Sequence, residues 1–168
     1  QDSEAAFPSI DGAGTRVVFQ RNAQNMAPGV TSSLQRIWVR DLTANTTTLA
    51  SSAPGGAAPN DQSTNPSLSR DGRFVSFTSF ATNLTTVDPG IVARSYRKDL
   101  QTGAVVVVSR ASNGDEANGD GGKSQISGDG RYVLFTSPAT NLSPDDATSD
   151  RDLFLRDVTG GTTTLVNP

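Results

Sequence analysis

The residues with the clearest capacity for chemistry stand in a short acidic loop at positions 145–152. Its four aspartates are Asp145, Asp146, Asp150 and Asp152. Carboxylate oxygens at closely spaced positions suit a hard cation such as calcium, so the loop is a candidate metal site. The alternative is a solvated acidic loop, in which Asp150 or Asp152 pairs with Arg151 or with a neighbouring base.

A second acidic stretch, at positions 116–121, begins with the spacing of a helix-loop-helix calcium loop. Glu116, Asn118 and Asp120 supply oxygen atoms at alternate positions. However, Ser127 stands where the closing bidentate glutamate of such a loop belongs, and strands rather than helices are expected on both sides. The Asn-Gly and Gly-Gly pairs in this stretch are typical of turns, which is the interpretation that we favour.

The composition excludes most of the common catalytic groups. The 168 residues include no cysteine and no histidine, so a thiol nucleophile, a thiolate metal site and the usual general base are all absent. Serine and threonine are abundant, but a serine nucleophile would need an unusual base. We therefore expect a protein that is not an enzyme and that has no cofactor, calcium being the one candidate ligand of this kind.

Charge and hydropathy exclude two further classes of partner. The formal net charge is −3, and the 14 lysine and arginine residues are spread thinly along the chain. Nucleic-acid binding requires a dense basic patch, so we expect no nucleic-acid partner. No apolar run approaches the roughly 20 residues of a membrane-spanning helix, so we expect no membrane span.

The candidate residues are positioned by an internal repeat. Phe19, Phe77 and Phe135 are each 58 positions apart, and shifting the chain by 58 aligns three copies without a gap. Identical residues occupy these sets of positions: Gly14/Gly72/Gly130, Val17/Val75/Val133, Phe19/Phe77/Phe135, Ala23/Ala81/Ala139, Asn25/Asn83/Asn141 and Asp41/Asp99/Asp157. Self-similarity at a fixed period of this size is the signature of a repeat architecture.

Each repeat contains four stretches with strand character, rich in β-branched and aromatic residues. In the three repeats, the first strand lies near 9–10, 67–68 and 125–126, and the second near 15–20, 73–79 and 131–137. The third strand lies near 36–42, 94–100 and 152–158, and the fourth near 46–51, 104–109 and 162–166. No segment has helical periodicity with capping residues. Four antiparallel strands with both faces covered form a β-propeller blade, so we predict an all-β fold with three four-stranded antiparallel blades.

We expect residues 1–168 to form a single repeat domain. The blades span about 7–52, 66–110 and 124–168, and the long loops 53–65 and 111–123 join them. The connections between second and third strands, at about 80–93 and 138–151, are also long, whereas the other turns are minimal. In an up-and-down blade both kinds of long connection emerge on one face, where binding is usually placed. We therefore expect one plain face and one elaborated face.

Three blades are too few to close a ring, because propellers typically have about four to eight. An open stack would leave two sheet faces and their apolar side chains exposed. Either the chain is part of a longer propeller, or two copies associate. We favour self-association, with dimerisation completing a six-bladed ring, because a twofold ring is a closed symmetry.

The first turn and the second strand of the repeats carry a family resemblance. Positions 69–77 read Ser-Arg-Asp-Gly-Arg-Phe-Val-Ser-Phe, and positions 127–135 read Ser-Gly-Asp-Gly-Arg-Tyr-Val-Leu-Phe. Both resemble the Ser-x-Asp-Gly-Arg-x-x-x-Phe repeat of TolB-like bacterial β-propellers, and the rest of the repeat resembles a long-repeat subgroup of that family. The first repeat departs from the pattern, with Ala13 in place of the turn aspartate and Thr15 in place of the arginine.

Three sets of repeated residues have both a functional and a structural interpretation. The sets are Asp41/Asp99/Asp157, Asn25/Asn83/Asn141 and Trp38/Tyr96/Phe154. A position repeated in every blade usually serves the blade. We therefore interpret the aspartates as turn caps, each beside a solvated base (Arg40, Lys98 or Arg156), and the asparagines as loop anchors. We interpret the aromatic residues as packing between blades rather than as a sugar-stacking surface.

The functional expectation is a non-enzymatic scaffold that binds a protein or another ligand through its long-loop face. A glycan- or calcium-dependent binding propeller is one alternative, and a propeller piece of a larger exported enzyme is another. The resemblance implies an exported or periplasmic protein. A composition rich in serine, threonine, asparagine, glycine and alanine, and poor in lysine, agrees with a secreted or periplasmic bacterial protein.

Overall fold

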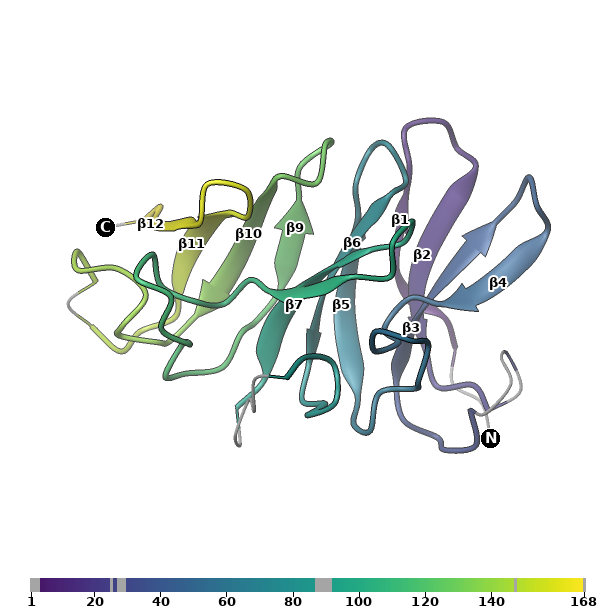
Figure 1. The fold of residues 1–168 in the computed structure, drawn as a ribbon, viewed down its shortest axis with the longest axis horizontal. Coiled ribbons are helices and arrows are strands. Elements are labelled where there is room, and N and C mark those ends of the chain that lie inside the picture. The colour runs from purple at the N-terminus through teal and green to yellow at the C-terminus, as the bar shows by residue number, and fades with distance from the viewer. Residues whose placement is uncertain (1–3, 25, 27–29, 87–91, 147, 168) are drawn as a thin grey trace.

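The structure, a computed structural model, describes residues 4–24, 26, 30–86, 92–146 and 148–167 (Figure 1). These residues form strands and no helix. Blade 1 contains β1 (Ala6–Ile10), β2 (Arg16–Arg21), β3 (Arg36–Asp41) and β4 (Thr46–Leu49). Blade 2 contains β5 (Ser63–Leu68), β6 (Phe74–Ser79), β7 (Arg94–Asp99) and β8 (Val105–Val107). Blade 3 contains β9 (Ser124–Ile126), β10 (Tyr132–Ser137), β11 (Asp152–Asp157) and β12 (Thr162–Leu165).

The strands of each repeat form one sheet in which every strand is antiparallel to its neighbours in the chain. The orders are β1-β2-β3-β4, β5-β6-β7-β8 and β9-β10-β11-β12, and the three sheets stand side by side (Figure 1). This arrangement confirms the predicted fold of three four-stranded antiparallel β-propeller blades. The strands lie within a few residues of the predicted positions.

The largest differences from prediction are at β1 and β5, which begin earlier than the sequence indicated. Both strands shift register against their partners in mid-strand. Phe7 and Asn65, which are equivalent in the repeat, have positive φ angles of 51° and 54°, and Pro8 and Pro66 follow them. A bulge of this kind allows a strand to continue past a proline that cannot donate to the ladder.

The middle strands of each blade carry the core. Phe77 lies opposite Tyr96 with ring centroids 5.7 Å apart, and Phe135 lies opposite Phe154 at 5.7 Å. Trp38, Tyr96 and Phe154 are at most 1% exposed. Tyr96 packs with side chains of blade 1 and Phe154 packs with Val108 of blade 2, which confirms packing between blades for these two rings. Trp38 belongs to neither cluster and donates its Nε1–H to Arg21 O of its own blade at 3.2 Å. None of the three buried rings is available for stacking on a sugar.

The two junctions between blades differ in chemistry. Blade 1 presents Val18, Ile37 and Val39 to blade 2, and all three are buried in one cluster with Phe77. At the equivalent positions, blade 2 has Ser76, Ser95 and Arg97 on its side toward blade 3. The first junction is therefore apolar on both sides, whereas at the second junction blade 2 contributes these polar side chains beside Val108, which is buried in one cluster with Phe135.

The connections divide between two edges of the stack. The tight turns lie toward the upper edge of Figure 1, and the long connections lie toward its lower edge. The molecule therefore has a short-turn face and a long-loop face, as the loop lengths predicted.

Candidate functional site on the long-loop face

Each linker between blades is fastened to a loop of the following blade by the same hydrogen bonds, which we call the amide clamp. The clamp residues are Asn60, Thr82 and Asn83 in blade 2 and Asn118, Thr140 and Asn141 in blade 3. In blade 3, Asn118 N donates to Asn141 Oδ1, Asn118 Nδ2 donates to Thr140 Oγ1, and Thr140 N donates to Asn118 Oδ1, all at 3.0 Å. The three equivalent distances in blade 2 are 3.1, 2.7 and 2.9 Å.

The clamp confirms the loop-anchoring role of two repeated asparagines. Asn83 Nδ2 also donates to Ala58 O at 2.9 Å, and Asn141 Nδ2 donates to Glu116 O at 2.8 Å. The third member of the set, Asn25, lies outside the described residues. Sequence comparison missed the other clamp residues because it concentrated on residues identical in all three copies, whereas Gln24 stands where the other copies have threonine.

A pocket of about 400 Å³ opens beside the clamp of blade 3. Its walls are the start of the second linker and the loop after β10, and its lining residues are Ala111, Ser112, Asn113, Thr140, Asn141, Leu142, Ser143 and Pro144. The walls are held in place, since Thr163 N donates to Ser112 Oγ at 2.8 Å and Asn113 Nδ2 donates to Asp115 Oδ2 at 2.7 Å. The lining is uncharged, with amide and hydroxyl groups suited to a neutral polar ligand.

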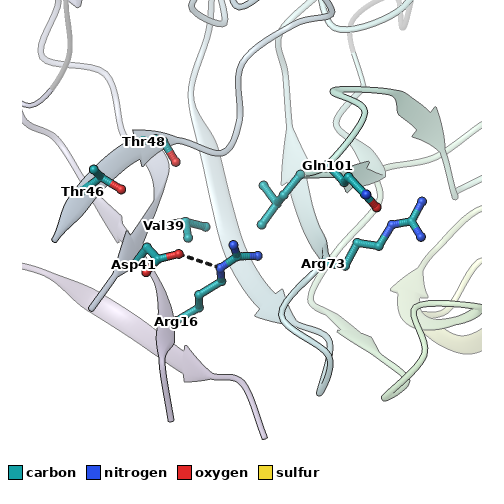
Figure 2. A pocket seen from close by; sticks show the side chains of 8 residues that line it. Arg16, Val39, Asp41, Thr46, Thr48, Arg73 and Gln101 are labelled. Atoms are coloured by element: carbon teal, nitrogen blue, oxygen red, sulfur yellow. Dashed lines mark hydrogen bonds and ion pairs between the residues drawn. The ribbon is translucent and has the colours of Figure 1, made fainter. Parts of the chain in front are cut away.

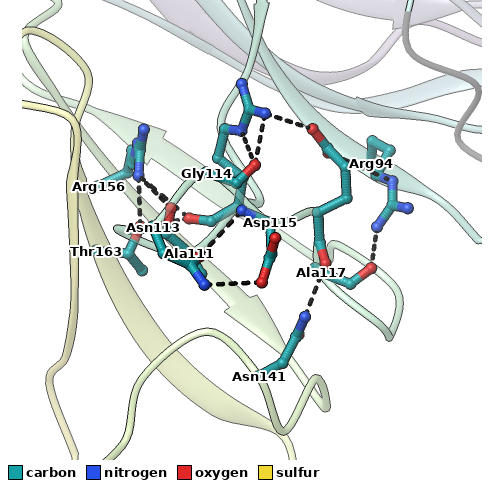
Figure 3. Close-up of polar contacts among 11 residues, drawn as sticks. Arg94, Ala111, Asn113, Gly114, Asp115, Ala117, Asn141, Arg156 and Thr163 are labelled. Atoms are coloured by element: carbon teal, nitrogen blue, oxygen red, sulfur yellow. Dashed lines mark hydrogen bonds and ion pairs between the residues drawn. The ribbon is translucent and has the colours of Figure 1, made fainter.

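An ion-pair cluster lies beneath the same linker (Figure 3). The Glu116 carboxylate lies 3.2 Å from Arg110 Nη2 and 4.0 Å from Arg94 Nε. Arg110 Nη2 also donates to Gly114 O at 2.6 Å, which closes the turn of the linker. The carboxylate of the second calcium-loop candidate is thus directed at two guanidinium groups, and this agrees with the turn interpretation of positions 116–121.

The acidic loop at 145–152 also lies on the long-loop face, between β10 and β11. Asp145 and Asp150 are exposed, and Asp146 and Asp152 are half-buried. Asp146 Oδ1 accepts from Thr148 N at 3.1 Å, and Asp152 Oδ1 accepts from Asn167 Nδ2 at 2.9 Å. Among the described residues, which leave out position 147, no three acidic side chains converge as they would around a metal ion.

The repeated aspartates at the ends of the third strands cap turns, as the sequence indicated. Asp99 Oδ1 accepts from Gln101 N at 2.8 Å, and Asp157 Oδ1 accepts from Gly160 N at 2.9 Å. Each also pairs with the arginine of the Asp-Gly-Arg turn. Arg73 Nη2 donates to Asp99 Oδ2 at 2.7 Å, and Arg131 Nη2 donates to Asp157 Oδ2 at 2.6 Å.

These arginines hold the pKa of Asp99 and that of Asp157 well below the usual range of a carboxyl, with help from the backbone donors. Blade 1 reaches the same pairing by different residues. Thr15 stands at the position of the arginine, but Arg16 Nε donates to Asp41 Oδ2 at 3.0 Å. The departure of the first repeat from the motif therefore changes the residues and retains the ion pair.

The interpretation of Lys98 and Arg156 as solvated bases was wrong. The two side chains are 5% and 8% exposed, because each inserts against the linker that enters its blade. Lys98 Nζ donates to Ser52 O at 2.6 Å, and Arg156 Nη1 donates to Arg110 O at 3.2 Å. Burial lowers the pKa of Lys98 to about 8.

A second pocket, of about 450 Å³, lies on the short-turn face between blades 1 and 2 (Figure 2). Its lining residues are Arg16, Val39, Asp41, Thr46, Thr48, Arg73, Leu100 and Gln101. Both arginines in this wall are engaged, since Arg16 pairs with Asp41 and Arg73 pairs with Asp99. The charges that line this pocket thus belong to the turn-capping architecture of the blades.

Comparison with known proteins supports the fold. No protein-family model matches the chain, and no curated protein matches its sequence. Among solved structures, TolB of Acinetobacter baumannii superposes with a TM-score of 0.60 at 18% identity, over 98% of this chain and 32% of that one. The β-propeller domain of the trilobed protease of Pyrococcus furiosus superposes with a TM-score of 0.59 at 14% identity, over 98% of this chain and 42% of that one.

Propellers attached to peptidases are also similar. Acylaminoacyl peptidase of Pyrococcus horikoshii superposes with a TM-score of 0.56 at 14% identity, over 97% of this chain and 24% of that one. The resemblance to TolB-like propellers is thus confirmed as a resemblance of fold. The chain spans less than half the length of each of these structures. No helix in the described part of the chain is long and apolar enough to cross a membrane.

Proposed function

We propose that this protein is a non-enzymatic binding scaffold whose long-loop face holds a protein ligand. The observation that carries the proposal is the pair of amide clamps, one on each linker. A loop that must present a ligand-binding surface benefits from such rigidity, because less conformational entropy is lost on binding. The proposal includes self-association, and an exported location in keeping with the composition.

Three features support a protein as the ligand. Phe80, at the start of the loop after β6, is 39% exposed, and exposed aromatic side chains commonly anchor protein interfaces. The pocket at Pro144 offers neutral amide and hydroxyl groups, which match the backbone of a bound peptide. The mid-strand aromatic rings, which were the candidate sugar-stacking surface, are buried.

Selection from a displayed peptide library, with a glycan array in parallel, tests this proposal. We expect peptides that bind the unmodified chain, and we expect Phe80→Glu and Pro144→Arg to reduce that binding at least tenfold. The matched controls are Ala44→Arg and Ala44→Glu, which place the charges of the two variants on an exposed position of the short-turn face. Selected peptides that bind all variants equally would place the ligand elsewhere, and capture of glycans alone would favour the glycan-binding alternative.

A further inference from the structure

Equivalent residues of the three blades differ in exposure at one end of the stack. Val75 and Phe77 of blade 2 are 0% exposed, because that face of the blade packs on blade 1. Val17 and Phe19 hold the same positions in blade 1 but are half-buried, and Ile10 on the same face is 58% exposed. The outer face of blade 1 therefore has the apolar composition of an interface between blades without a neighbour among the described residues.

The opposite end has the complementary face. Leu134 and Leu155 of blade 3 are half-buried, and with Gln125 and Tyr132 they line a mainly apolar depression of about 240 Å³. Their equivalents in blade 1, Val18 and Val39, are 0% and 4% exposed because blade 2 covers them. Blade 3 thus ends in the kind of surface on which a following blade packs.

Polar contacts at the two internal junctions repeat with the same 58-residue period. Backbone N–H groups of Ser63 and Gly121 donate to Gln35 O and Ala93 O, both at 2.8 Å. The N–H groups of Leu68 and Ile126 donate to Ser9 Oγ and Ser67 Oγ at 3.2 and 3.3 Å. Continuing these series by 58 residues gives the N–H groups of Ala5 and Ile10 at one end of the stack. Their acceptors across a further junction would be Arg151 O and a side-chain oxygen of Gln125 at the other end.

The tight turns show the same pattern. A methyl group added to Gly72 would lie 3.0 Å from Asp11 of blade 1, and one added to Gly130 would overlap Phe74 of blade 2. At Gly14, the equivalent turn of blade 1, an added methyl group would meet no atom within 4 Å. The turn of blade 1 therefore lacks, among the described residues, the neighbouring blade that the turns of blades 2 and 3 contact.

We propose that a second copy of the chain packs the outer face of its blade 1 on the outer face of blade 3, and that the reciprocal contact closes a six-bladed ring. This inference rests on the self-association in the proposed function and specifies its surfaces. A second copy fits because blade 1 offers the apolar side chains and the backbone donors that blades 2 and 3 use against their predecessors. Two identical junctions close under twofold symmetry and leave no apolar face exposed.

Engineered cysteines test the junction directly, since the chain has no cysteine of its own. At the internal junction, Ser76 Oγ and Ser124 Oγ are 3.0 Å apart. The equivalent pair across the proposed junction is Leu134 of one copy and Pro8 of the other. Under mild oxidation, we expect the Pro8→Cys/Leu134→Cys variant to form a disulfide-linked species of twice the 17.5 kDa chain mass on a non-reducing denaturing gel.

The Ser76→Cys/Ser124→Cys variant is the matched control, which should lose its free thiols and stay at 17.5 kDa. A ladder of larger species from the Pro8→Cys/Leu134→Cys variant would overturn the closed ring in favour of open stacking. Because β1 has a bulge that β9 lacks, Val18→Cys/Pro66→Cys, the equivalent pair at the first junction where β5 has the same bulge, is a second control. Free thiols in the Pro8→Cys/Leu134→Cys variant, with both control pairs oxidised, would overturn the junction. Light scattering of the unmodified chain gives a second readout. Twice the chain mass supports the proposal, whereas a single-chain mass at about 50 μM overturns it without bearing on ligand binding by the long-loop face.

Discussion

Phe19→Ala, Phe77→Ala and Phe135→Ala make one chemical change at the same position of three blades. Phe77 and Phe135 are 0% exposed, whereas Phe19 is half-buried on the outer face of blade 1. The three variants therefore keep the chemistry and the strand position constant while the burial changes. Any difference in the free energy of unfolding among them measures the presence or absence of a preceding blade.

The magnitude follows from the burial of each ring. Replacing a fully buried phenylalanine with alanine costs about 3–5 kcal/mol, from lost transfer energy and from the cavity left behind. For Phe77 and Phe135 this includes the stack on Tyr96 or Phe154. A half-buried ring loses roughly half as much, so Phe19→Ala should cost about 2 kcal/mol in a single chain. The expected difference of about 2 kcal/mol corresponds to about 4–8 °C in Tm for a domain of this size.

Urea and thermal unfolding, followed at several chain concentrations, measure these costs. At concentrations where light scattering gives the mass of one chain, Phe19→Ala should be the mildest of the three variants. If two copies close a ring, the cost of Phe19→Ala should rise toward that of Phe77→Ala as the concentration increases, because a second copy then covers the ring of Phe19. The costs of the other two variants should not change in this way.

One result would refute the reasoning. If Phe19→Ala costs as much as Phe77→Ala while the protein is a single chain, then the burial of the ring does not set the loss. A cost for Phe135→Ala far below that for Phe77→Ala would count against it as well, since the two rings have equal exposure and equal stacking geometry.

Three further predictions concern other parts of the molecule. Burial lowers the pKa of Lys98 from 10.5 to about 8, so the unfolded chain keeps this proton to higher pH than the folded chain. Stability should rise by at most about 3 kcal/mol as pH rises through this interval, and Lys98→Met should abolish the rise in urea unfolding curves taken up to pH 10. Asn118→Ala removes clamp hydrogen bonds and should weaken the local structure of the second linker by about 1–2 kcal/mol, seen as faster hydrogen exchange at 111–123. Asn60→Ala makes the same change in the first linker, so equal exchange at 111–123 in the two variants would contradict the clamp. Millimolar calcium should leave Tm unchanged, because the carboxylates of Asp146 and Asp152 already accept hydrogen bonds from the chain; a rise that Asp146→Asn removes would establish the calcium site instead.

Much of the fold was predictable because the sequence pattern of one blade occurs three times in the chain. Phe77 and Asp99 recur with the same period, so the strand and its turn are identified without any knowledge of their contacts. The bulges at Phe7 and Asn65 were not predictable in this way, because a proline within a short strand reads as a strand boundary. Only the pairing with the neighbouring strand shows that β1 and β5 continue across it.

The candidate site was less accessible to sequence reasoning than the fold. Loop lengths located the long-loop face, but the partners of Asn60 and Asn118 depend on how two separate loops meet in space. Lys98 was misread because the sequence shows a base beside an acid and does not show the linker that covers it. The identity of a ligand depends on side chains that vary between copies, and there the repeat gives no guidance.

The unequal junctions have a consequence for how the stack comes apart. Blade 2 faces blade 3 with Ser76, Ser95 and Arg97. At the equivalent positions blade 1 faces blade 2 with the aliphatic side chains of Val18, Ile37 and Val39. In a linear array, the stability of each unit is its own folding energy plus the coupling to its neighbours. We expect the less apolar second junction to be the weaker one, so that blade 3 is the first unit to detach under load or denaturant and blades 1 and 2 unfold together.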